Sequence, residues 1–361
     1  MRIVSVVGAR PNFVKLAPVV RALAARANVE HIVVHTGQHY DPTMSGDFFK
    51  ELEIPPPQYN LEVGSGSHGE QTAAVIARFE QVCRKLAPDW VLVYGDVNST
   101  VAAALAAVKL GTKVAHVEAG LRSYDRSMPE EHNRVLTDHL ADLLFTPSRD
   151  ASDNLRREGI PDDRVAFIGN VMIDTLAAVL GRARELNMAA RLGVARHGFT
   201  LVTLHRPSNV DDLHTLSELC EALAELHRRR PVVFPVHPRS RARLEASGLL
   251  TRISGVCLIE PLPYIAMLSL MEAAGLVITD SGGVQEETTF LGVPCLTVRP
   301  GTERPITVTL GTNRLVKPTS AAILDAAAHV TRPTTVPKLE RWDGAASDRL
   351  VRVLCDGTWV E

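Results

Sequence analysis

The sequence predicts an α/β fold with two domains, each a parallel β-sheet covered by helices on both faces. Three observations support this prediction. The chain has 361 residues, more than one ordinary hydrophobic core holds, and 45% of them are hydrophobic. Short apolar runs alternate with longer stretches whose apolar residues recur at helical spacing. The apolar runs are continuous, which is typical of strands buried on both faces of a parallel sheet.

The predicted strands fall into two sets. In the first half of the chain they cover residues 2–8, 30–37, 89–96, 113–120, 143–148 and 165–170. In the second half they cover residues 200–207, 232–238, 256–261, 276–283, 295–299 and 314–318. Helical patterns between them include residues 102–111 and 214–229. We therefore expect two Rossmann-like domains, at residues 1–169 and 170–345, and a C-terminal helix at 346–361 that could return to the first domain.

Several of these strands end in polar side chains. Asp96 ends the run DWVLVYGD, and Glu118 comes at the end of the next strand, KVAHVEAG. Ligands of open α/β sheets bind at the carboxyl ends of the strands. Two such edges facing each other would form one cleft between the domains. A strand end can also be polar simply because it is exposed. The other polar strand ends are His205-Arg206, His237, Glu260 and Asp280-Ser281.

A first anion site is predicted at the junction VVGARPNFVKLAPVV. Gly8 allows a sharp turn, and Arg10 and Lys15 fall at or just before the start of a helix. Pro18 fits best in the first turn of that helix, because proline breaks a helix interior. Two cations at the positive end of a helix are unfavourable unless an anion binds there, and a phosphate would satisfy both. The alternative is that Arg10 and Lys15 point to solvent.

A second anion site is predicted at LVITDSGGVQEETTFLG. Ser281 can cap the following helix, and Gly282 and Gly283 let the backbone form a nest for phosphate oxygens. Glu286 and Glu287 lie early in the helix, where carboxylates suit its dipole but would repel a phosphate. At least one of them is therefore expected to face a hydroxyl-bearing group such as ribose. Together the two sites indicate a nucleotide diphosphate, which could carry a sugar.

A cluster of carboxylates is predicted around the helix that begins at PEEHNR. The prediction puts Val135, Leu136, Leu140, Leu143 and Leu144 on the buried face. Arg134 lies four residues after Glu130, on the same side of the helix. Asp96, Glu118 and Glu130 would then converge, with Arg134 paired to one of them, and His205 would approach from the other domain. Crowded carboxylates raise one another's pKa, which suits proton transfer. For Glu131 we expect only an interaction with the helix dipole.

Composition and charge exclude several classes of function. The formal net charge of -2 provides no overall basic field for nucleic acid. Five cysteines without a CxxC pair favour reduced thiols over disulfides or a zinc site. The first residues lack the apolar region of a signal peptide, and no apolar run is long enough to span a membrane. We expect a cytoplasmic protein that binds neither nucleic acid nor membranes.

Neither a cofactor nor a metal is expected. Residues 64–69, GSGSHG, match a dinucleotide-binding pattern, but they follow a proline-rich loop and not a buried strand. The sequence has no P-loop pattern. It also has no set of histidines and carboxylates with good metal-ligand spacing.

Nine motifs taken together resemble one family, the non-hydrolysing UDP-N-acetylglucosamine (UDP-GlcNAc) 2-epimerases. The resemblance runs in order from about residue 1 to residue 315, so it covers nearly the whole chain. The motifs are GARPNFVKLAPV, TGQHYD, GDVNST, HVEAGLRS, PEEHNR, LHRPSN, PVHPR, TDSGGVQEE and TERP.

This resemblance implies a fold like that of GT-B glycosyltransferases, a homodimer, and interconversion of UDP-GlcNAc and UDP-N-acetylmannosamine (UDP-ManNAc). The family reaction removes the C2 proton and expels UDP, giving 2-acetamidoglucal, and UDP then adds back. By motif position, Asp96, Glu118 and Glu130 are the implied acid/base groups, and His205 supports UDP departure. The substrate-binding residues implied in the same way are Arg10, Lys15, Arg134, Ser281, Gly282, Gly283, Glu287 (ribose) and Arg304.

Some relatives bind a second UDP-GlcNAc as an allosteric activator. Gln38, Arg206 and His237 match part of that site, whereas Asp41 stands where those relatives carry glutamine. Residues 205–208 also read HRPS where bacterial relatives often read HRRE. Relatives with a GARPN-type opening include enzymes for modified sugars such as UDP-diacetamido-uronic acids. Three alternatives remain, namely a GT-B glycosyltransferase, a hydrolysing epimerase, and a nucleotide-sugar sensor without catalysis.

Overall fold

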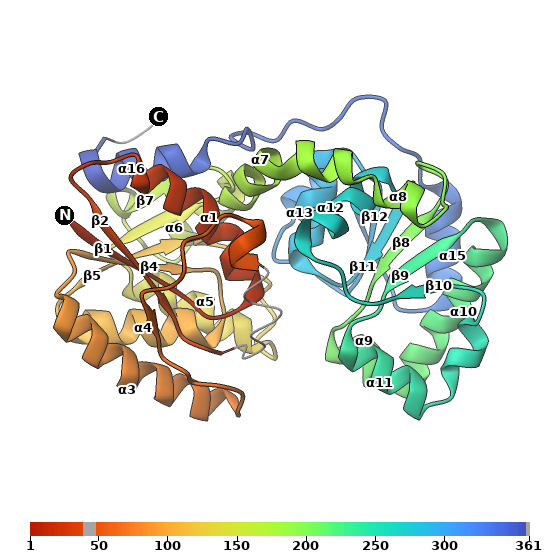
Figure 1. The fold of residues 1–361 in the computed structure, drawn as a ribbon, viewed down its shortest axis with the longest axis horizontal. Coiled ribbons are helices and arrows are strands. Elements are labelled where there is room, and N and C mark those ends of the chain that lie inside the picture. The colour runs from red at the N-terminus through yellow and green to blue at the C-terminus, as the bar shows by residue number, and fades with distance from the viewer. Residues whose placement is uncertain (39–47, 359–361) are drawn as a thin grey trace. The chain divides into compact units, whose positions relative to one another are not determined.

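The computed structural model describes residues 1–38 and 48–358, and contacts divide the chain into two compact units. The first unit joins Met1–Ala178 to Glu340–Glu361, and the second unit is Val179–Leu339. Figure 1 shows the blue C-terminal segment returning to the red N-terminal part of the first unit. The division falls inside helix α7 (Val171–Leu186), whereas the boundary predicted from the sequence lies before this helix, between residues 169 and 170.

The first unit is built on a parallel sheet with the strand order β3-β2-β1-β4-β5-β6-β7 among the described residues. The predicted parallel sheet is confirmed, and only the short strand β3 was missed. The strands are β1 (Arg2–Val7), β2 (Glu30–His35), β3 (Tyr59–Asn60), β4 (Trp90–Tyr94), β5 (Lys113–Val117), β6 (Leu143–Thr146) and β7 (Val165–Phe167).

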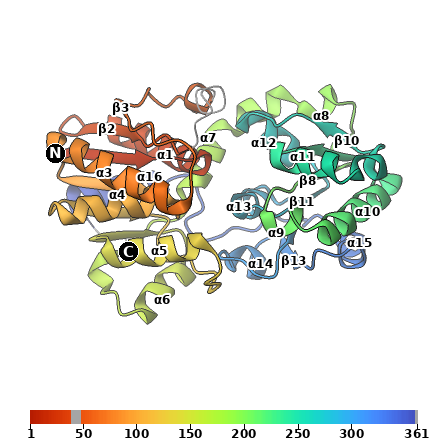
Figure 2. The ribbon, with the colours of Figure 1, turned by 90° about the horizontal axis from the view of Figure 1, so that it is seen from below.

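Helices cover both faces of this sheet. Figures 1 and 2 show α3 and α4 side by side on one face, while α1 and α16 lie on the other. Alternate strand residues such as Val4 and Val6 pack with Phe79 of α3 and with the small alanines of α4. Described helices of this unit, besides α7, are α1 (Arg10–Ala24), α3 (His68–Leu86), α4 (Asn98–Lys109), α5 (Pro129–Leu140), α6 (Arg149–Arg157) and α16 (Ala346–Asp356), with a 3₁₀ turn at Asp162–Arg164.

Helix α1 starts earlier than the sequence analysis predicts. It begins at Arg10, with Pro11 in its first turn, so Pro18 lies in the interior and Lys15 lies one turn inside the helix. Proline at this position cannot donate to the carbonyl of Val14, four residues before it. The Thr175 hydroxyl donates to that carbonyl instead, at 2.6 Å. This substitute hydrogen bond explains why the helix continues through Pro18.

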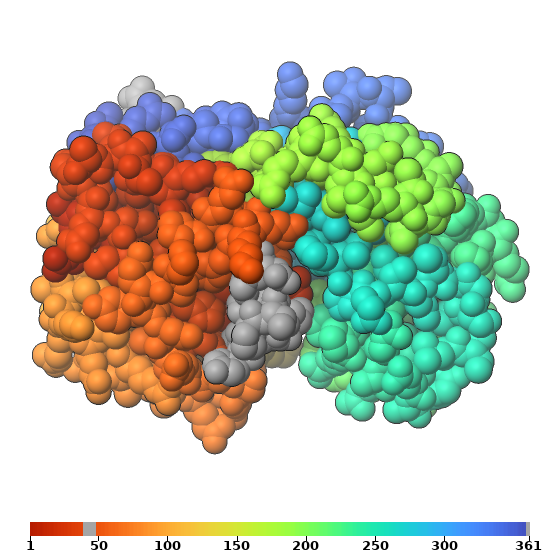
Figure 3. Space-filling model, in the orientation of Figure 1, coloured from red at the N-terminus to blue at the C-terminus, as the bar shows by residue number. Residues whose placement is uncertain are grey.

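The C-terminal helix α16 packs against α1 in the first unit. In Figure 3 its blue atoms lie beside the red atoms of the N-terminal segment. Asp174 holds the start of α16, accepting from Ala346 N (3.1 Å) and from Ser347 N and Oγ (2.7 Å each). Burial raises the pKa of Asp174, although these hydrogen bonds act to lower it. Trp342, just before α16, is buried and donates to the Pro147 carbonyl at 3.0 Å.

The second unit holds a parallel sheet with the order β10-β9-β8-β11-β12-β13. Its core includes fully buried strand residues such as Val202 and Ile278, and each such side chain contributes about 1.5–3 kcal/mol. The strands are β8 (Thr200–Thr203), β9 (Val232–Pro235), β10 (Cys257–Ile259), β11 (Leu276–Thr279), β12 (Cys295–Val298) and β13 (Asn313–Val316). The described helices are α8 (Met188–Arg191), α9 (Pro207–Val210), α10 (Leu213–Arg229), α11 (Pro238–Ala246), α12 (Tyr264–Ala273), α13 (Gly282–Leu291), α14 (Ile306–Thr309) and α15 (Ser320–His329), with a 3₁₀ turn at Leu249–Ile253.

Candidate active site

In the first unit, the candidate site lies where β1 and β4 are neighbours. From β1 the chain crosses to β2 on one side, and β4 lies on the other side. At such a switch point the loops after both strands leave a crevice, where open α/β sheets bind ligands. Asn12 joins the two loops. Its side chain donates to the Tyr94 carbonyl (2.8 Å) and accepts from the N–H groups of Gly8 and Ala9 (3.2 Å each).

Lys15 and Glu118 form a buried ion pair beside this switch point, with Lys15 Nζ donating to Glu118 Oε2. Their side chains are 6% and 4% exposed. A Cβ atom on Gly95 would lie 2.8 Å from Lys15 Nζ and 3.1 Å from Glu118 Oε2. The backbone just before Asp96 therefore passes directly over the pair. Because water cannot solvate these buried charges, the ammonium and the carboxylate stabilise each other.

Glu118 has a backbone conformation that non-glycine residues rarely adopt. Its φ is +73°, which costs about 1–3 kcal/mol for a residue of this kind. The N–H groups of Glu118 and Ala119 both donate to the Phe145 carbonyl, at 3.1 and 3.0 Å. These two hydrogen bonds hold the strained turn and fix the direction in which the Glu118 carboxylate leaves the sheet.

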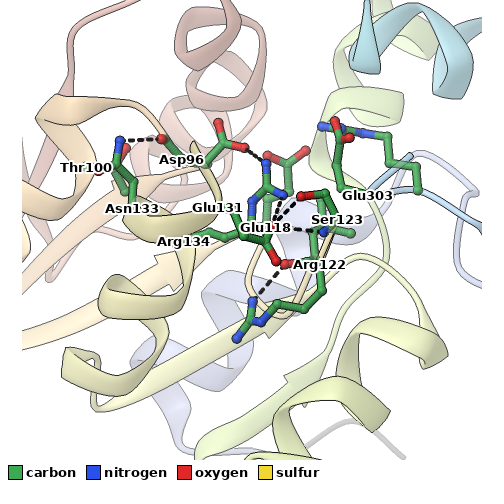
Figure 4. A network of polar contacts seen from close by, with 12 residues as sticks. Asp96, Thr100, Glu118, Arg122, Ser123, Glu131, Asn133, Arg134 and Glu303 are labelled. Carbon is green, nitrogen blue, oxygen red and sulfur yellow. Dashed lines mark hydrogen bonds and ion pairs between the residues drawn. The ribbon is translucent and has the colours of Figure 1, made fainter. Parts of the chain in front are cut away.

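Asp96 is held by Arg134 of α5, as Figure 4 shows. Arg134 Nη2 donates to Asp96 Oδ2, and Arg134 Nη1 donates to Glu131 Oε2 at 2.6 Å. Asn133 adds a contact from the same helix, donating to the Asp96 carbonyl at 2.9 Å. The Asp96 side chain stays 24% exposed, whereas the Arg134 side chain is 3% exposed. Asp96 is therefore anchored on one side and accessible on the other.

The buried face of α5 is polar. Of the residues predicted for an apolar face, Leu143 and Leu144 are buried but belong to β6, whereas Val135 and Leu140 are half-buried. The buried residues of α5 are Glu131, Arg134, Thr137 and Asp138, while Leu136 is 55% exposed. Glu131 was predicted only to interact with the helix dipole, but its carboxylate also makes specific hydrogen bonds. It accepts from Ser123 N and Oγ and from Tyr124 N at 2.8–2.9 Å, in addition to its contact with Arg134. Residue hydrophobicity misled the prediction because these charges are compensated inside the fold.

Glu130 lies in the first turn of α5 and is half-buried. Arg134, predicted from the sequence to lie beside Glu130, contacts Asp96 and Glu131 instead. Within the described residues the Glu130 side chain makes neither a hydrogen bond nor an ion pair. Asp96 and Glu118 are thus brought together because Gly95, the residue before Asp96, lies against the Glu118 carboxylate. Glu130 lies apart from this contact, at the N-terminal end of α5.

In the second unit the corresponding switch point lies between β8 and β11. Asp280, fully buried after β11, accepts from the N–H groups of His205 (3.0 Å) and Arg206 (2.9 Å) and from Asn209 Nδ2 (3.1 Å). His205 Nδ1 lies 2.9 Å from Asp280 Oδ1. Burial acts to raise the pKa of Asp280. His205 and the N–H groups of His205 and Arg206 have the larger, lowering effect, so the net shift of this pKa is downward. This carboxylate orients the His205 ring, whose side chain is 42% exposed.

Ser281 and the two glycines after it open helix α13 beside this switch point. Ser281 is the residue before the helix, but its side chain does not cap it, contrary to the prediction. Its N–H group instead donates to Thr279 Oγ1 at 3.0 Å. A Cβ atom on Gly282 would lie 2.4 Å from Arg304 Nη1 and 2.6 Å from Glu303 Oε1. Glycine at this position allows Arg304 to lie against the positive end of α13.

Arg304 sits among buried charges of both signs. Its guanidinium contacts Glu303 and lies 3.0 Å from Glu286 Oε2, and Glu303 also accepts from Arg299 at 2.8 Å. These four side chains are all 7% exposed or less. The sequence predicts Glu286 at the helix dipole, but in the structure this carboxylate faces the Arg304 guanidinium.

Glu287 is buried and accepts from the Tyr264 hydroxyl at 2.8 Å. Burial raises the pKa of Glu287 to about 7, against the lowering effect of Tyr264 and with a further rise from the Glu286 charge. A carboxyl group with this pKa exchanges its proton near neutral pH. It would accept from a ligand hydroxyl when ionised and donate when protonated.

Comparison with known families identifies the chain. A model described as UDP-N-acetylglucosamine 2-epimerase matches residues 21–355. The chain belongs to the UDP-N-acetylglucosamine 2-epimerase family.

Curated and solved members of this epimerase family match almost the full chain. A UDP-N-acetylglucosamine 2-epimerase homolog of Methanococcus maripaludis is 45% identical over 359 residues, 98% of this chain and 99% of the relative. A UDP-2,3-diacetamido-2,3-dideoxy-D-glucuronate 2-epimerase of Pseudomonas aeruginosa is 44% identical over 331 residues, 91% of each chain. The crystal structure of the Methanocaldococcus jannaschii UDP-GlcNAc 2-epimerase, in complex with UDP-GlcNAc and UDP, matches with a TM-score of 0.92. That protein is 41% identical, and the match covers 99% of this chain and 100% of that one.

The residues that resemble the epimerase family's activator site belong to different units. Gln38 is in the first unit, where it accepts from Ser99 N (3.2 Å) and Oγ (2.7 Å). His237 is in the second unit with its ring 5.8 Å from that of His205, and Arg206 is the residue before α9. Asp41 lies outside the described residues.

Arg10, another predicted ligand of this epimerase family member, stacks over the Phe48 ring at 4.8 Å. In the described part of the chain, no group of three or more histidine, cysteine, aspartate or glutamate side chains could hold a metal ion. The helices seen there also include none that is both long and apolar enough to cross a bilayer.

Sequence reasoning missed His116, Asn133 and Asp138 in this epimerase. His116 and Asp138 contact each other between β5 and α5, at 2.6 Å. One signal was available: Glu131, Arg134 and Asp138 recur at helical spacing along one side of α5, as a buried polar stripe does.

Proposed function

We propose that the protein interconverts UDP-GlcNAc and UDP-ManNAc by eliminating and re-adding UDP through 2-acetamidoglucal. Family membership and the names of the relatives support this activity. The observation that carries it here is the pair of carboxylates Asp96 and Glu118 at the β1/β4 switch point, each paired with a cation. Proton transfer at C2 requires such positioned acids and bases.

In the proposed reaction one carboxylate accepts the C2 proton. The electrons of the C–H bond form the C1–C2 double bond as the bond from C1 to the UDP oxygen breaks. For return, that oxygen attacks C1 and a second acid delivers a proton to the opposite face of C2. Asp96, Glu118 and Glu130 are the proposed acid/base groups, and the assignment of base and acid among them is open.

The proposed UDP site lies in the second unit. The N-terminus of α13, formed by Ser281, Gly282 and Gly283, would bind the diphosphate together with Arg304. Glu287 would bind the ribose hydroxyls. His205, oriented by Asp280, would stabilise the departing UDP oxygen through Nε2. Arg10, Lys15 and Arg134 complete the proposed substrate contacts on the side of the first unit.

The proposed acids lie in the first unit, and the proposed UDP site lies in the second unit. The proposal also includes a cytoplasmic homodimer that requires neither cofactor nor metal and binds neither nucleic acid nor membranes. A second substrate is favoured by one specific observation. The Pseudomonas aeruginosa relative, 44% identical, is named for a UDP-diacetamido-glucuronate. A UDP-diacetamido-uronic acid is therefore the alternative substrate.

The test is proton NMR of UDP-GlcNAc incubated with the enzyme in deuterated water, without an acceptor. UDP-ManNAc with deuterium at C2 and no free sugar is the expected result. Free ManNAc and UDP would indicate a hydrolysing epimerase. No conversion of UDP-GlcNAc would reject it as the substrate, and UDP-diacetamido-uronic acids would be tested next. Turnover that appears only when a glycosyl acceptor is added would favour a glycosyltransferase.

A further inference from the structure

His116 of β5 lies fully buried between two hydrogen-bond acceptors. Its Nε2 is 2.8 Å from the Gly95 carbonyl, and its Nδ1 is 2.6 Å from Asp138 Oδ1. A carbonyl oxygen only accepts, so Nε2 must carry a proton. The state of the ring therefore depends on which partner holds the proton between Nδ1 and Asp138.

The surroundings of Asp138 favour its ionised form over its protonated form. Its other oxygen accepts from Gly120 N (3.1 Å) and from Arg122 Nη1 (2.6 Å), both donors that cannot accept in return. Burial acts to raise the pKa of Asp138, whereas the charges and hydrogen bonds of His116 and Arg122 bring the net direction down. The contribution of Arg122, which contacts Oδ2 at 2.6 Å, does not depend on the state of the His116 ring. With the proton absent from Asp138, His116 Nδ1 carries it. Both ring nitrogens then donate, and the ring is an imidazolium.

The charges around the ring alternate in sign. Beyond Asp138 lie Arg122 and then Glu158, which accepts from Arg122 at 2.7 Å and also faces His139 at 3.3 Å. On the other side, the Gly95 backbone covers the Lys15–Glu118 pair. Buried charges survive only when each is compensated in this way.

We propose that His116 is a doubly protonated clamp that positions the loops carrying Asp96 and Glu118 for proton transfer. The positioning role rests on the proposed epimerase function. Gly95 directly precedes Asp96, and Gly120 follows Glu118 by two residues. Asp138 bonds Gly120 directly and reaches Gly95 through His116, so one side chain of α5 fixes both acid-bearing loops. Arg134 of the same helix holds the Asp96 carboxylate.

The protonation state is tested by ¹⁵N NMR of the histidine side chains in the full chain at neutral pH. His116 is expected to show two protonated ring nitrogens. One protonated and one unprotonated nitrogen would overturn the assignment. His31, a largely buried histidine of β2 beside Ser5 (2.8 Å), is the internal reference, because burial lowers its pKa to about 4 and its ring should be neutral.

The positioning role is tested with His116→Asn, which cannot reach both acceptors. We expect kcat to fall about 10²-fold, since a displacement of about 1 Å in a catalytic group costs that much, with KM and UDP affinity little changed. His31→Asn is the matched control and should keep its activity. An unchanged kcat in His116→Asn would overturn the role.

Asp138→Asn is the second variant, in case His116→Asn does not fold. Its amide can donate to Nδ1 while Nε2 still donates to Gly95, so the contacts remain and the ring becomes neutral. We expect the doubly protonated signature to disappear and kcat to fall about tenfold, because charge-assisted hydrogen bonds are about twice as strong as neutral ones. An unchanged ring signature together with unchanged kcat would contradict the clamp.

Failure of the clamp is distinguishable from failure of the proposed function. The ring nitrogens report the protonation state whether or not UDP-GlcNAc is turned over. Backbone amide shifts of residues 95–96 and 118–120 report the positioning without any substrate. Shifts at these residues in His116→Asn are expected, and their absence would overturn the positioning role even if the wild-type enzyme proved active on another sugar.

Discussion

Lys15 of α1 and Glu118 after β5 are 103 residues apart in the sequence, yet they form an ion pair that is almost fully buried. The sequence predicts Lys15 at a diphosphate and Glu118 among the acids, as separate features. Lys15 therefore balances the charge of Glu118, a proposed acid, and at the same time belongs to α1, the helix that follows β1. A change at either residue therefore acts on both.

Removing one partner of this pair should destabilise the first unit. Lys15→Met leaves the Glu118 carboxylate buried without a counter-charge, which costs about 3–5 kcal/mol. Chemical denaturation measures the loss. Lys109→Met, on the exposed side of α4, should stay within about 0.5 kcal/mol of wild type. Adding Glu118→Gln to Lys15→Met should recover part of the loss, and simple additivity would contradict the coupling.

Asp96→Asn should abolish most turnover while UDP binding persists. The amide keeps the size of the side chain but cannot exchange a proton with C2, and such groups contribute about 10²–10⁴-fold to the rate. Steady-state kinetics and UDP calorimetry together measure the two properties. Asp89→Asn is the control, since Asp89 precedes the opposite end of β4 and accepts from Arg2 N at 2.7 Å. Unchanged turnover in Asp96→Asn would remove Asp96 from the mechanism.

Asp280→Asn should slow the reaction through His205. An amide at this position cannot compensate a positive charge on the His205 ring, so Nε2 would stabilise the departing UDP oxygen less. We expect kcat to fall about 10²-fold or more, comparable to His205→Ala. His214→Ala, an exposed histidine of α10, should have no effect. If both Asp280→Asn and His205→Ala weakened only UDP affinity, the role of His205 would be binding alone.

Glu287 should make stability fall as the pH rises toward neutrality. Burial raises its pKa from 4.5 to about 7, so between these values the folded protein holds a proton that the unfolded chain has released. Its stabilising contribution is complete below 4.5 and is lost as the pH approaches about 7, a change of about 3 kcal/mol. Glu287→Gln should remove this dependence. Thermal unfolding across the range measures it, and parallel curves for the two proteins would contradict it.

The fold could be predicted from the sequence because its strands are continuous apolar runs with a local signature. Among the described strands, β3 has only two residues, too few to show an apolar run in the sequence. The positions of Asp96, Glu118, His205 and Asp280 at strand ends were likewise predictable, since parallel strands present their carboxyl ends at one edge.

Pairings between distant segments could not be predicted. The polar stripe of α5 is visible in the residue spacing, but the spacing does not show that Asp96, Ser123 and His116 will meet it, so the stripe is easily taken for a solvent-exposed face. The beginning of α1 was misplaced for the same reason, since Thr175 supplies the hydrogen bond that Pro18 lacks from a segment far along the chain. In both cases the deciding contact is tertiary.

The second unit is one continuous segment, whereas the first is completed only by the residues after 339. During synthesis, Val179–Leu339 can therefore finish folding while α1 still lacks α16. The apolar residues of α1 that α16 will cover stay open until the ribosome has made the entire second unit. Deleting α16 should therefore leave nascent chains with a folded second half and a first half that chaperones retain.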